Sequence, residues 1–185
     1  MRVAVFCSSS DRVDPEYVRT AEDVGRKLAD RGHELVWGGG RLGLMGAVAR
    51  GAQDRGGRIV GVIPESMMSV EVAYTDADEL LVVADMRTRK QEMDQRSDAF
   101  LILPGGFGTL EELSEILVGR VLAHHMRPVV LLDDRGFYRP LLDLFDHFVE
   151  HGFAVPGHLA HLRVVETVDR ALEAVEAGNP SPHGR

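Results

Sequence analysis

Short apolar runs alternate along this chain with longer segments that have helical patterns of apolar and polar residues. The short runs indicate β-strands, and most are continuously apolar, which is typical of strands buried on both faces of a parallel sheet. The predicted strands cover residues 3–7, 34–37, 59–63, 79–84, 99–103, 128–132 and 162–165.

The longer segments predict helices over residues 15–31, 42–55, 86–96, 110–123, 137–151 and 168–177. Asp14 and Pro15 give the first helix a clear start, because an acidic N-cap is followed by proline at the first helical position. This order predicts an α/β fold: a three-layer, Rossmann-like, doubly wound parallel sheet with helices on both faces. We expect a single domain over residues 1–178 and a disordered tail over residues 179–185.

Ligands of such sheets bind beyond the carboxyl ends of the strands, where the strand order reverses. If the order begins 3-2-1-4-5, the reversal lies between the first and fourth strands. The segments that meet there are then residues 7–10, 38–46, 85–90 and 104–112, which concentrates the unusual residues of the chain at one place.

Composition narrows the class of protein. Of 185 residues, 44% are hydrophobic and 27% charged, which is typical of a globular chain. The formal net charge of −8 argues against nucleic acid or an anionic membrane as partner, because both require a basic surface. No apolar run is long enough to span a bilayer, and no signal peptide is found, so we expect a cytoplasmic protein.

The only cysteine, Cys7, excludes an internal disulfide or a multi-cysteine zinc site, and we expect it to be buried at a strand end. We interpret the eight histidines as lacking i,i+4 metal spacing with an intervening acid, so no metal site is expected. No cofactor is expected either.

Residues 38–43, GGGRLG, match the G-x-G-x-x-G pattern of dinucleotide-binding loops. The match follows the second strand instead of the first, which argues against a nicotinamide cofactor. A tight turn that packs a helix closely on a strand explains it equally well. A loop facing a phosphate or base, with Gly39 and Gly40 as contacts, is the other interpretation.

Residues 104–112, PGGFGTLEE, carry a predicted buried strand through three glycines into a helix. Glycines permit close approach of an anion, and a helix start offers free N–H groups and a positive dipole end. The lysine of a Walker loop is absent. Thr109 and Glu112 also have the spacing of a capping box, and spacing alone slightly favours this structural role over catalysis.

Arg89 and Lys90 follow the fourth predicted strand. Arg89 is placed to form a local i,i+4 pair with Asp85, or to bind a phosphate or a leaving base at the crevice. Ser8 and its two neighbouring serines offer hydroxyls to a phosphate or ribose, although a polar turn explains them as well.

Together these motifs resemble a known family. Residues 104–112 match its P-G-G-x-G-T-x-x-E signature, and residues 86–93, MRTRKQEM, resemble its M-x-x-R-K-x-x-M element. The family is that of the "Lonely Guy" cytokinin-activating phosphoribohydrolases, often labelled lysine decarboxylase-like. The resemblance extends from about Val3 to Val165.

The resemblance implies hydrolysis of the N-glycosidic bond of a purine riboside 5′-monophosphate, with adenine or an N6-modified adenine as base, to free base and ribose 5-phosphate. It places the catalytic pair on Arg89 and Glu112, and it implies a homodimer with its site near the interface. The implied nucleotide contacts are Glu71, Lys90, Gly105, Gly106, Phe107, Gly108, Thr109, Leu110 and Glu111.

Two alternatives accompany this interpretation. Lysine decarboxylation through pyridoxal phosphate needs a Schiff-base lysine, and the chain has only Lys27, in the middle of a helix, and Lys90. A binding protein for a phosphorylated cofactor, like the molybdenum-cofactor carriers, is the stronger rival.

Residues 118–125, VGRVLAHH, differ from the W-A-Q-L-G segment of many plant members, which leaves the base preference open.

Overall fold

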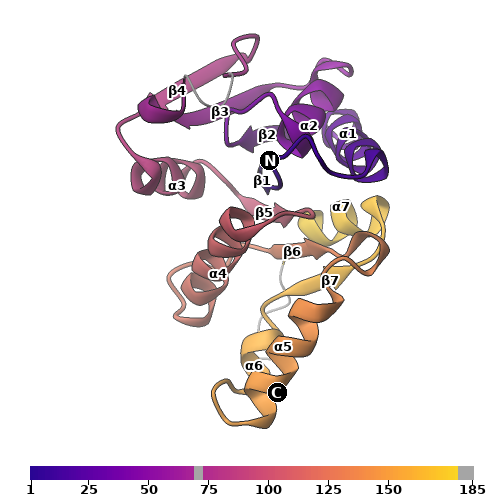
Figure 1. The fold of residues 1–185 in the computed structure, drawn as a ribbon, viewed down its shortest axis with the longest axis vertical. Coiled ribbons are helices and arrows are strands. Elements are labelled where there is room, and N and C mark those ends of the chain that lie inside the picture. The colour runs from indigo at the N-terminus through magenta and orange to yellow at the C-terminus, as the bar shows by residue number, and fades with distance from the viewer. Residues whose placement is uncertain (69–72, 179–185) are drawn as a thin grey trace.

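The computed structural model describes residues 1–68 and 73–178, which form a seven-stranded parallel sheet with the order β4-β3-β2-β1-β5-β6-β7 (Figure 1). The strands are β1 (Arg2–Phe6), β2 (Glu34–Trp37), β3 (Ile59–Pro64), β4 (Glu79–Val83), β5 (Ala99–Ile102), β6 (Val129–Leu132) and β7 (Arg163–Val165). Each predicted strand is present, and the α/β fold is confirmed.

The described helices are α1 (Pro15–Asp30), α2 (Gly43–Gln53), α3 (Met86–Gln95), α4 (Phe107–Val121), α5 (Arg139–Glu150), α6 (Pro156–Leu159) and α7 (Val168–Glu176), with 3₁₀ turns η1 (Glu65–Met67) and η2 (Asp134–Gly136). The short helix α6 and both turns were not predicted. Asp14 caps α1 as expected, because its carboxylate accepts a hydrogen bond from the Glu16 amide at 2.8 Å. No described helix has both the length and the apolar character needed to cross a membrane.

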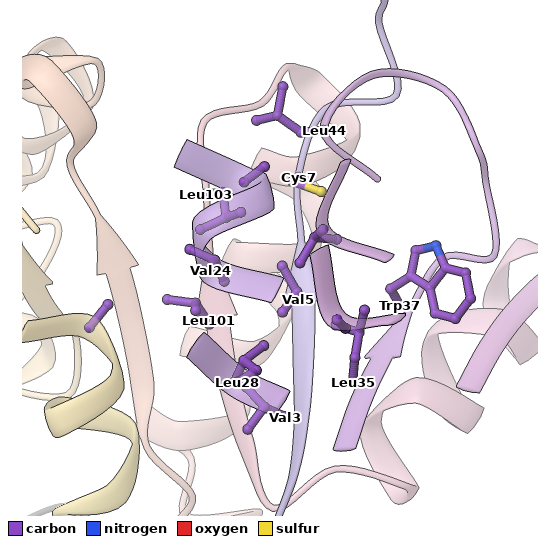
Figure 2. Close-up of a cluster of buried hydrophobic side chains, with 14 of the residues drawn as sticks. Val3, Val5, Cys7, Val24, Leu28, Leu35, Trp37, Leu44, Leu101 and Leu103 are labelled. Carbon is purple, nitrogen blue, oxygen red and sulfur yellow. The ribbon is translucent and has the colours of Figure 1, made fainter. Parts of the chain in front are cut away.

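Two apolar layers lie on opposite faces of the sheet. Successive residues of a strand point to opposite faces, so Val3 and Val5 pack against α1, α2 and α7, while Ala4 and Phe6 pack against α3, α4 and α5. Figure 2 shows the first layer, in which Val24 of α1 lies over the strands. This double burial explains the continuously apolar strands and confirms the three-layer arrangement.

The expected position of the fourth strand is wrong. β1 pairs with β2 and β5, and β4 pairs with β3 at the edge of the sheet. β4 is suited to an edge, since Val82 is 47% exposed. From β4 the chain returns through α3 to β5, beside β1 (Figure 1), so the strand order reverses between β1 and β5.

The predicted tail, residues 179–185, lies outside the described residues, and the expectation of a single domain over residues 1–178 stays a prediction.

Candidate active site

A pocket of about 320 Å³ opens at the carboxyl ends of β1 and β5. Its wall comes from the turn after β1, the start of α4, one side of α3, and methionines from α2 and η1. The lining residues are Cys7, Ser8, Ser9, Ser10, Met45, Met67, Met86, Arg89, Lys90, Gly106, Phe107, Gly108, Thr109, Glu111 and Glu112. Met86 belongs to the M-x-x-R-K-x-x-M element of the sequence, whereas Met45 and Met67 were not predicted and no motif marks them as pocket residues.

Arg89 and Glu112 form a buried ion pair in this pocket. Arg89 Nη1 lies 3.3 Å from Glu112 Oε1, and the two residues are only 4% and 6% exposed. Arg89 Nε also donates to the Val62 carbonyl of β3 at 3.2 Å. Removing one member of such a pair leaves the other charge buried, which typically costs about 3–5 kcal/mol. The two side chains are therefore held together from α3 and α4.

The local roles considered for these two residues are both wrong. Asp85 caps α3 by accepting a hydrogen bond from the Thr88 amide at 2.8 Å, which lowers its pKa, while Arg89 points to Glu112. The capping box fails because α4 begins at Phe107 and its N-cap, Gly106, has no side chain. Glu112 thus lies one turn inside the helix, where its carboxylate meets Arg89.

The first amides of α4 face the pocket without a side-chain cap. No acidic residue stands in the first turn, and the first N–H groups of a helix have no intrahelical acceptor. A Cβ added to Gly106 or Gly108 would meet no heavy atom within 4 Å, so these glycines leave the approach to the helix start open. Gly105 differs, because its Cβ would lie 2.1 Å from Thr109 Oγ1. An anion can therefore approach this helix start closely.

Lys90 closes one side of the pocket. Its ammonium donates to Glu111 at 2.8 Å and forms an ion pair with Glu115 at 2.6 Å. The contact with Glu111 has the larger effect and the contact with Glu115 the next, and both raise the pKa of Lys90. A neighbouring pocket of about 360 Å³ between α3 and α4 shares Lys90 and Glu112 as lining residues. Lys90 therefore stands between two cavities and stays charged.

The turn after β1 is fixed by backbone hydrogen bonds. The Ser8 amide donates to Pro104 at 3.2 Å, and the Ser8 carbonyl accepts from the Leu44 amide at 2.9 Å. Cys7 is 1% exposed, as expected, and burial, followed by the charge of Glu112, raises the pKa of its thiol. This turn thus holds Ser8 at the pocket while Cys7 stays protonated.

Some sequence candidates lie elsewhere. Gly40 pairs with Ala73, and its carbonyl accepts from the Trp37 indole at 3.2 Å. A Cβ on Gly39 would contact Ile63, and Leu110 packs against the apolar layer beneath α4. The glycine loop after β2 thus serves close packing, and these residues do not line the pocket. Glu71 lies outside the described residues.

The interpretation of the histidines is wrong. His147 and His151 are four residues apart with Glu150 between them, and the ligand atoms of all three lie within 4.8 Å of one another. The sequence itself carries this pattern, at residues 147–151.

Comparisons with known proteins agree with the motifs. Residues 45–175 match the family model described as "Possible lysine decarboxylase". A probable cytokinin riboside 5′-monophosphate phosphoribohydrolase from Oryza sativa subsp. japonica is 41% identical over 97% of this chain and 73% of its own length. An enzyme of that name from Rhodococcoides fascians is 42% identical over 95% of this chain and 89% of its own length. A third such enzyme, from Arabidopsis thaliana, is 44% identical over 84% of this chain and 72% of its own length.

Solved structures share the fold at low sequence identity. The molybdenum cofactor binding protein from Rippkaea orientalis has a TM-score of 0.72 at 20% identity, covering 95% of both chains. The molybdenum cofactor carrier protein from Chlamydomonas reinhardtii has a TM-score of 0.70 at 22% identity, covering 95% of this chain and 96% of its own. These likenesses show the fold alone. The family model and the relatives above 40% identity show more: the chain belongs to the family of cytokinin riboside 5′-monophosphate phosphoribohydrolases, whose model carries the older description of possible lysine decarboxylases.

Proposed function

We propose that this protein hydrolyses the N-glycosidic bond of a purine riboside 5′-monophosphate, with adenine or an N6-modified adenine as base. The relatives of more than 40% identity bear the name of this activity. The observation that carries the proposal is the buried Arg89–Glu112 pair, 3.3 Å apart, beside an uncapped helix start in one pocket.

The chemistry needs a carboxylate beside the ribose. The bond between C1′ and the base nitrogen breaks, water adds to C1′, and a proton from that water ends on the departing base. C1′ passes through an oxocarbenium-like state, which a nearby carboxylate stabilises. Glu112 supplies that carboxylate, by facing the cation, orienting a ribose hydroxyl or activating the water.

Arg89 acts on the other side of the breaking bond. Its Nε–H is engaged by the Val62 carbonyl, and Nη1 is shared between Glu112 and the Met86 sulfur at 3.3 Å. These contacts fix the plane of the guanidinium. In our proposal it holds the nucleotide and offsets negative charge that develops on the leaving base.

The start of α4 is proposed to bind the 5′-phosphate. Its amides, the open glycines Gly106 and Gly108, and the hydroxyl of Thr109 suit an anion, and Lys90 adds a cation. Phosphate binding far from C1′ supplies energy for the reaction and a reason to reject nucleosides. Phe107, which is 92% exposed, is proposed as a contact at the mouth, and Glu71 and Ser8 stay proposed contacts.

The lysine decarboxylase description does not fit the lysines. A Schiff-base lysine needs a depressed pKa, whereas Lys90 is held by two carboxylates that raise its pKa. Lys27 lies on α1, where it pairs with Asp169 of α7 at 2.8 Å, which also raises its pKa. No step through pyridoxal phosphate follows from either residue.

We further propose a homodimer whose interface lies near the pocket. The helix that carries Glu112 and its C-cap residue expose apolar side chains, with Val118 54% and Leu122 58% exposed. Exposed apolar side chains gathered on one helix favour burial against another chain. In light scattering, the wild-type protein should have the mass of two chains, and Leu122→Glu should have the mass of one. A monomeric wild type would contradict the dimer. A cytoplasmic location stays a prediction.

The activity is tested by chromatography of the free base released from AMP, N6-prenyl-AMP, GMP, CMP and adenosine. We expect cleavage of adenine monophosphates, little from adenosine, and loss of at least about a hundredfold in Glu112→Gln. The matched control Glu166→Gln, at an exposed position, should keep full activity. If no nucleotide is cleaved although AMP binds, the cofactor-carrier alternative replaces the enzyme.

A further inference from the structure

The end of α5 carries three metal-binding side chains on one exposed face. His147, Glu150 and the following cap residue His151 are spaced three and four residues apart, which stacks them on the same side of a helix. All three are exposed, and one ligand atom from each lies within 4.8 Å of the other two. In Figure 1, α5 lies at the end of the molecule farthest from α1 and α2, away from the pocket lined by α3 and α4.

A hydrogen bond already orients one of the imidazoles. His151 Nδ1 lies 3.0 Å from the His147 carbonyl oxygen, which can only accept, so Nδ1 carries the proton. In the neutral ring the lone pair is then on Nε2, which is the nitrogen left to coordinate an ion. Metal-binding histidines commonly donate their other N–H to a backbone carbonyl in this way. The two rings also lie close, with centroids 4.0 Å apart.

The surroundings favour a cation. The site lies at the carboxyl end of α5, where the helix dipole is negative. Asp143 and Asp146 stand one turn earlier, four residues before His147 and Glu150, and add negative charge to the same end of the helix.

We propose that His147, Glu150 and His151 bind a divalent transition-metal ion of the Zn²⁺, Ni²⁺ and Cu²⁺ class. Two imidazole nitrogens and one carboxylate oxygen suit these ions, whereas Mg²⁺ prefers oxygen ligands alone. Zinc–nitrogen bonds of about 2.0–2.1 Å require the ligand atoms to draw together, which exposed side chains achieve by rotating. Water completes the coordination, and the ion ties the last turn of α5 to its cap.

The test is calorimetric titration of the tag-free full chain with ZnCl₂, NiCl₂ and MgCl₂. We expect one Zn²⁺ or Ni²⁺ per chain at this site and no Mg²⁺. The double variant His147→Ala/His151→Ala should bind Zn²⁺ at least about tenfold more weakly, and Glu150→Gln should also weaken it. His124→Ala, an exposed histidine outside the cluster, should bind like the wild type. Equal Zn²⁺ binding by wild type and double variant overturns the proposal.

A second measurement needs no variant. Zn²⁺ should protect His147 and His151 of the wild-type chain from diethyl pyrocarbonate, as read by peptide mass spectrometry, while His124 reacts with or without the ion. Equal modification of His147 and His151 in both conditions also overturns the site. Neither experiment depends on the hydrolase activity.

Discussion

Gly38 and Arg89 are in direct contact, and the contact requires a glycine. A Cβ built on Gly38 would lie 1.7 Å from Arg89 Nη2, so any other residue would occupy the space of the guanidinium. Gly38 follows β2, and Arg89 extends from α3 across β3 to reach it. The glycine loop after β2 therefore contributes to the site without facing the ligand, because it makes room for the arginine that pairs with Glu112.

Gly38→Ala should therefore displace Arg89 from Glu112. A misplacement of about 1 Å in a catalytic site costs about a hundredfold in rate, so we expect kcat/KM for AMP or prenyl-AMP to fall by at least that factor. Gly157→Ala is the matched control, since a Cβ there meets no heavy atom within 4 Å. Retention of full activity by Gly38→Ala would show that the position of Arg89 is not critical.

Gly108→Ala should separate stability from ligand binding. A Cβ at Gly108 has open space, and alanine in a helix is favoured over glycine by about 0.5–1 kcal/mol, so the melting temperature should stay or rise. The added methyl group would stand where we propose the phosphate, so KM should increase by about tenfold or more. Gly105→Ala should instead destabilise the fold, since its Cβ would clash with Thr109. An unchanged KM in Gly108→Ala contradicts phosphate binding at this helix start.

Met93 anchors the helix that carries Arg89. Arg89 and Met93 are the buried residues of α3, and Met93 is 0% exposed in the apolar layer beneath α3 and α4. Met93→Ala should lower the free energy of unfolding by about 2–5 kcal/mol in denaturant titrations. Met126→Ala, at a position 54% exposed, should change it little. Comparable losses in the two variants would mean that α3 is held mainly by its polar contacts.

The strands were predictable because burial on both faces leaves a continuous apolar run in the sequence. The position of β4 in the sheet was not predictable. Strand order depends on the side of the sheet to which the chain returns after each helix, and residues 79–84 have the apolar pattern of any buried strand. Arg89 still reaches the pocket, although its strand does not lie beside the first strand as expected. Its partners are Val62 of β3 and Glu112 of α4, and no local spacing in the sequence reveals these contacts.

The start of α4 shows why the role of Glu112 was ambiguous. The Thr109 to Glu112 spacing imitates a capping box, and glycine at the true N-cap gives no side-chain signal that the helix begins at Phe107. The N-cap at Gly106 excludes the capping box, and the catalytic role of Glu112 stays a proposal. The i,i+4 spacing of His147 and His151, by contrast, is visible in the sequence alone.

His125 should make stability depend on pH. Burial first, and then the charge of Arg127, lower its pKa, while its Nε2 donates to the Ile116 carbonyl at 3.0 Å. Among the described residues no acceptor meets the buried Nδ1, so a second proton would lack a partner. The neutral ring is therefore favoured in the folded state, and the unfolded chain binds the proton near pH 6.5.

The contribution of His125 to the free energy of unfolding is thus fully present above about pH 6.5. It decreases as the pH falls below that value and stops changing once the pH is below the pKa of His125 in the folded state. His125→Phe keeps the ring contact with Phe100, whose centroid lies 5.4 Å away. Denaturant titrations between pH 7 and 5 should give a smaller loss of unfolding free energy in this variant than in the wild type. His161, whose pKa burial also lowers, accounts for part of the remaining slope, so His125→Phe/His161→Phe should flatten it further. An identical slope in all three proteins would mean that neither imidazole is held neutral by the fold.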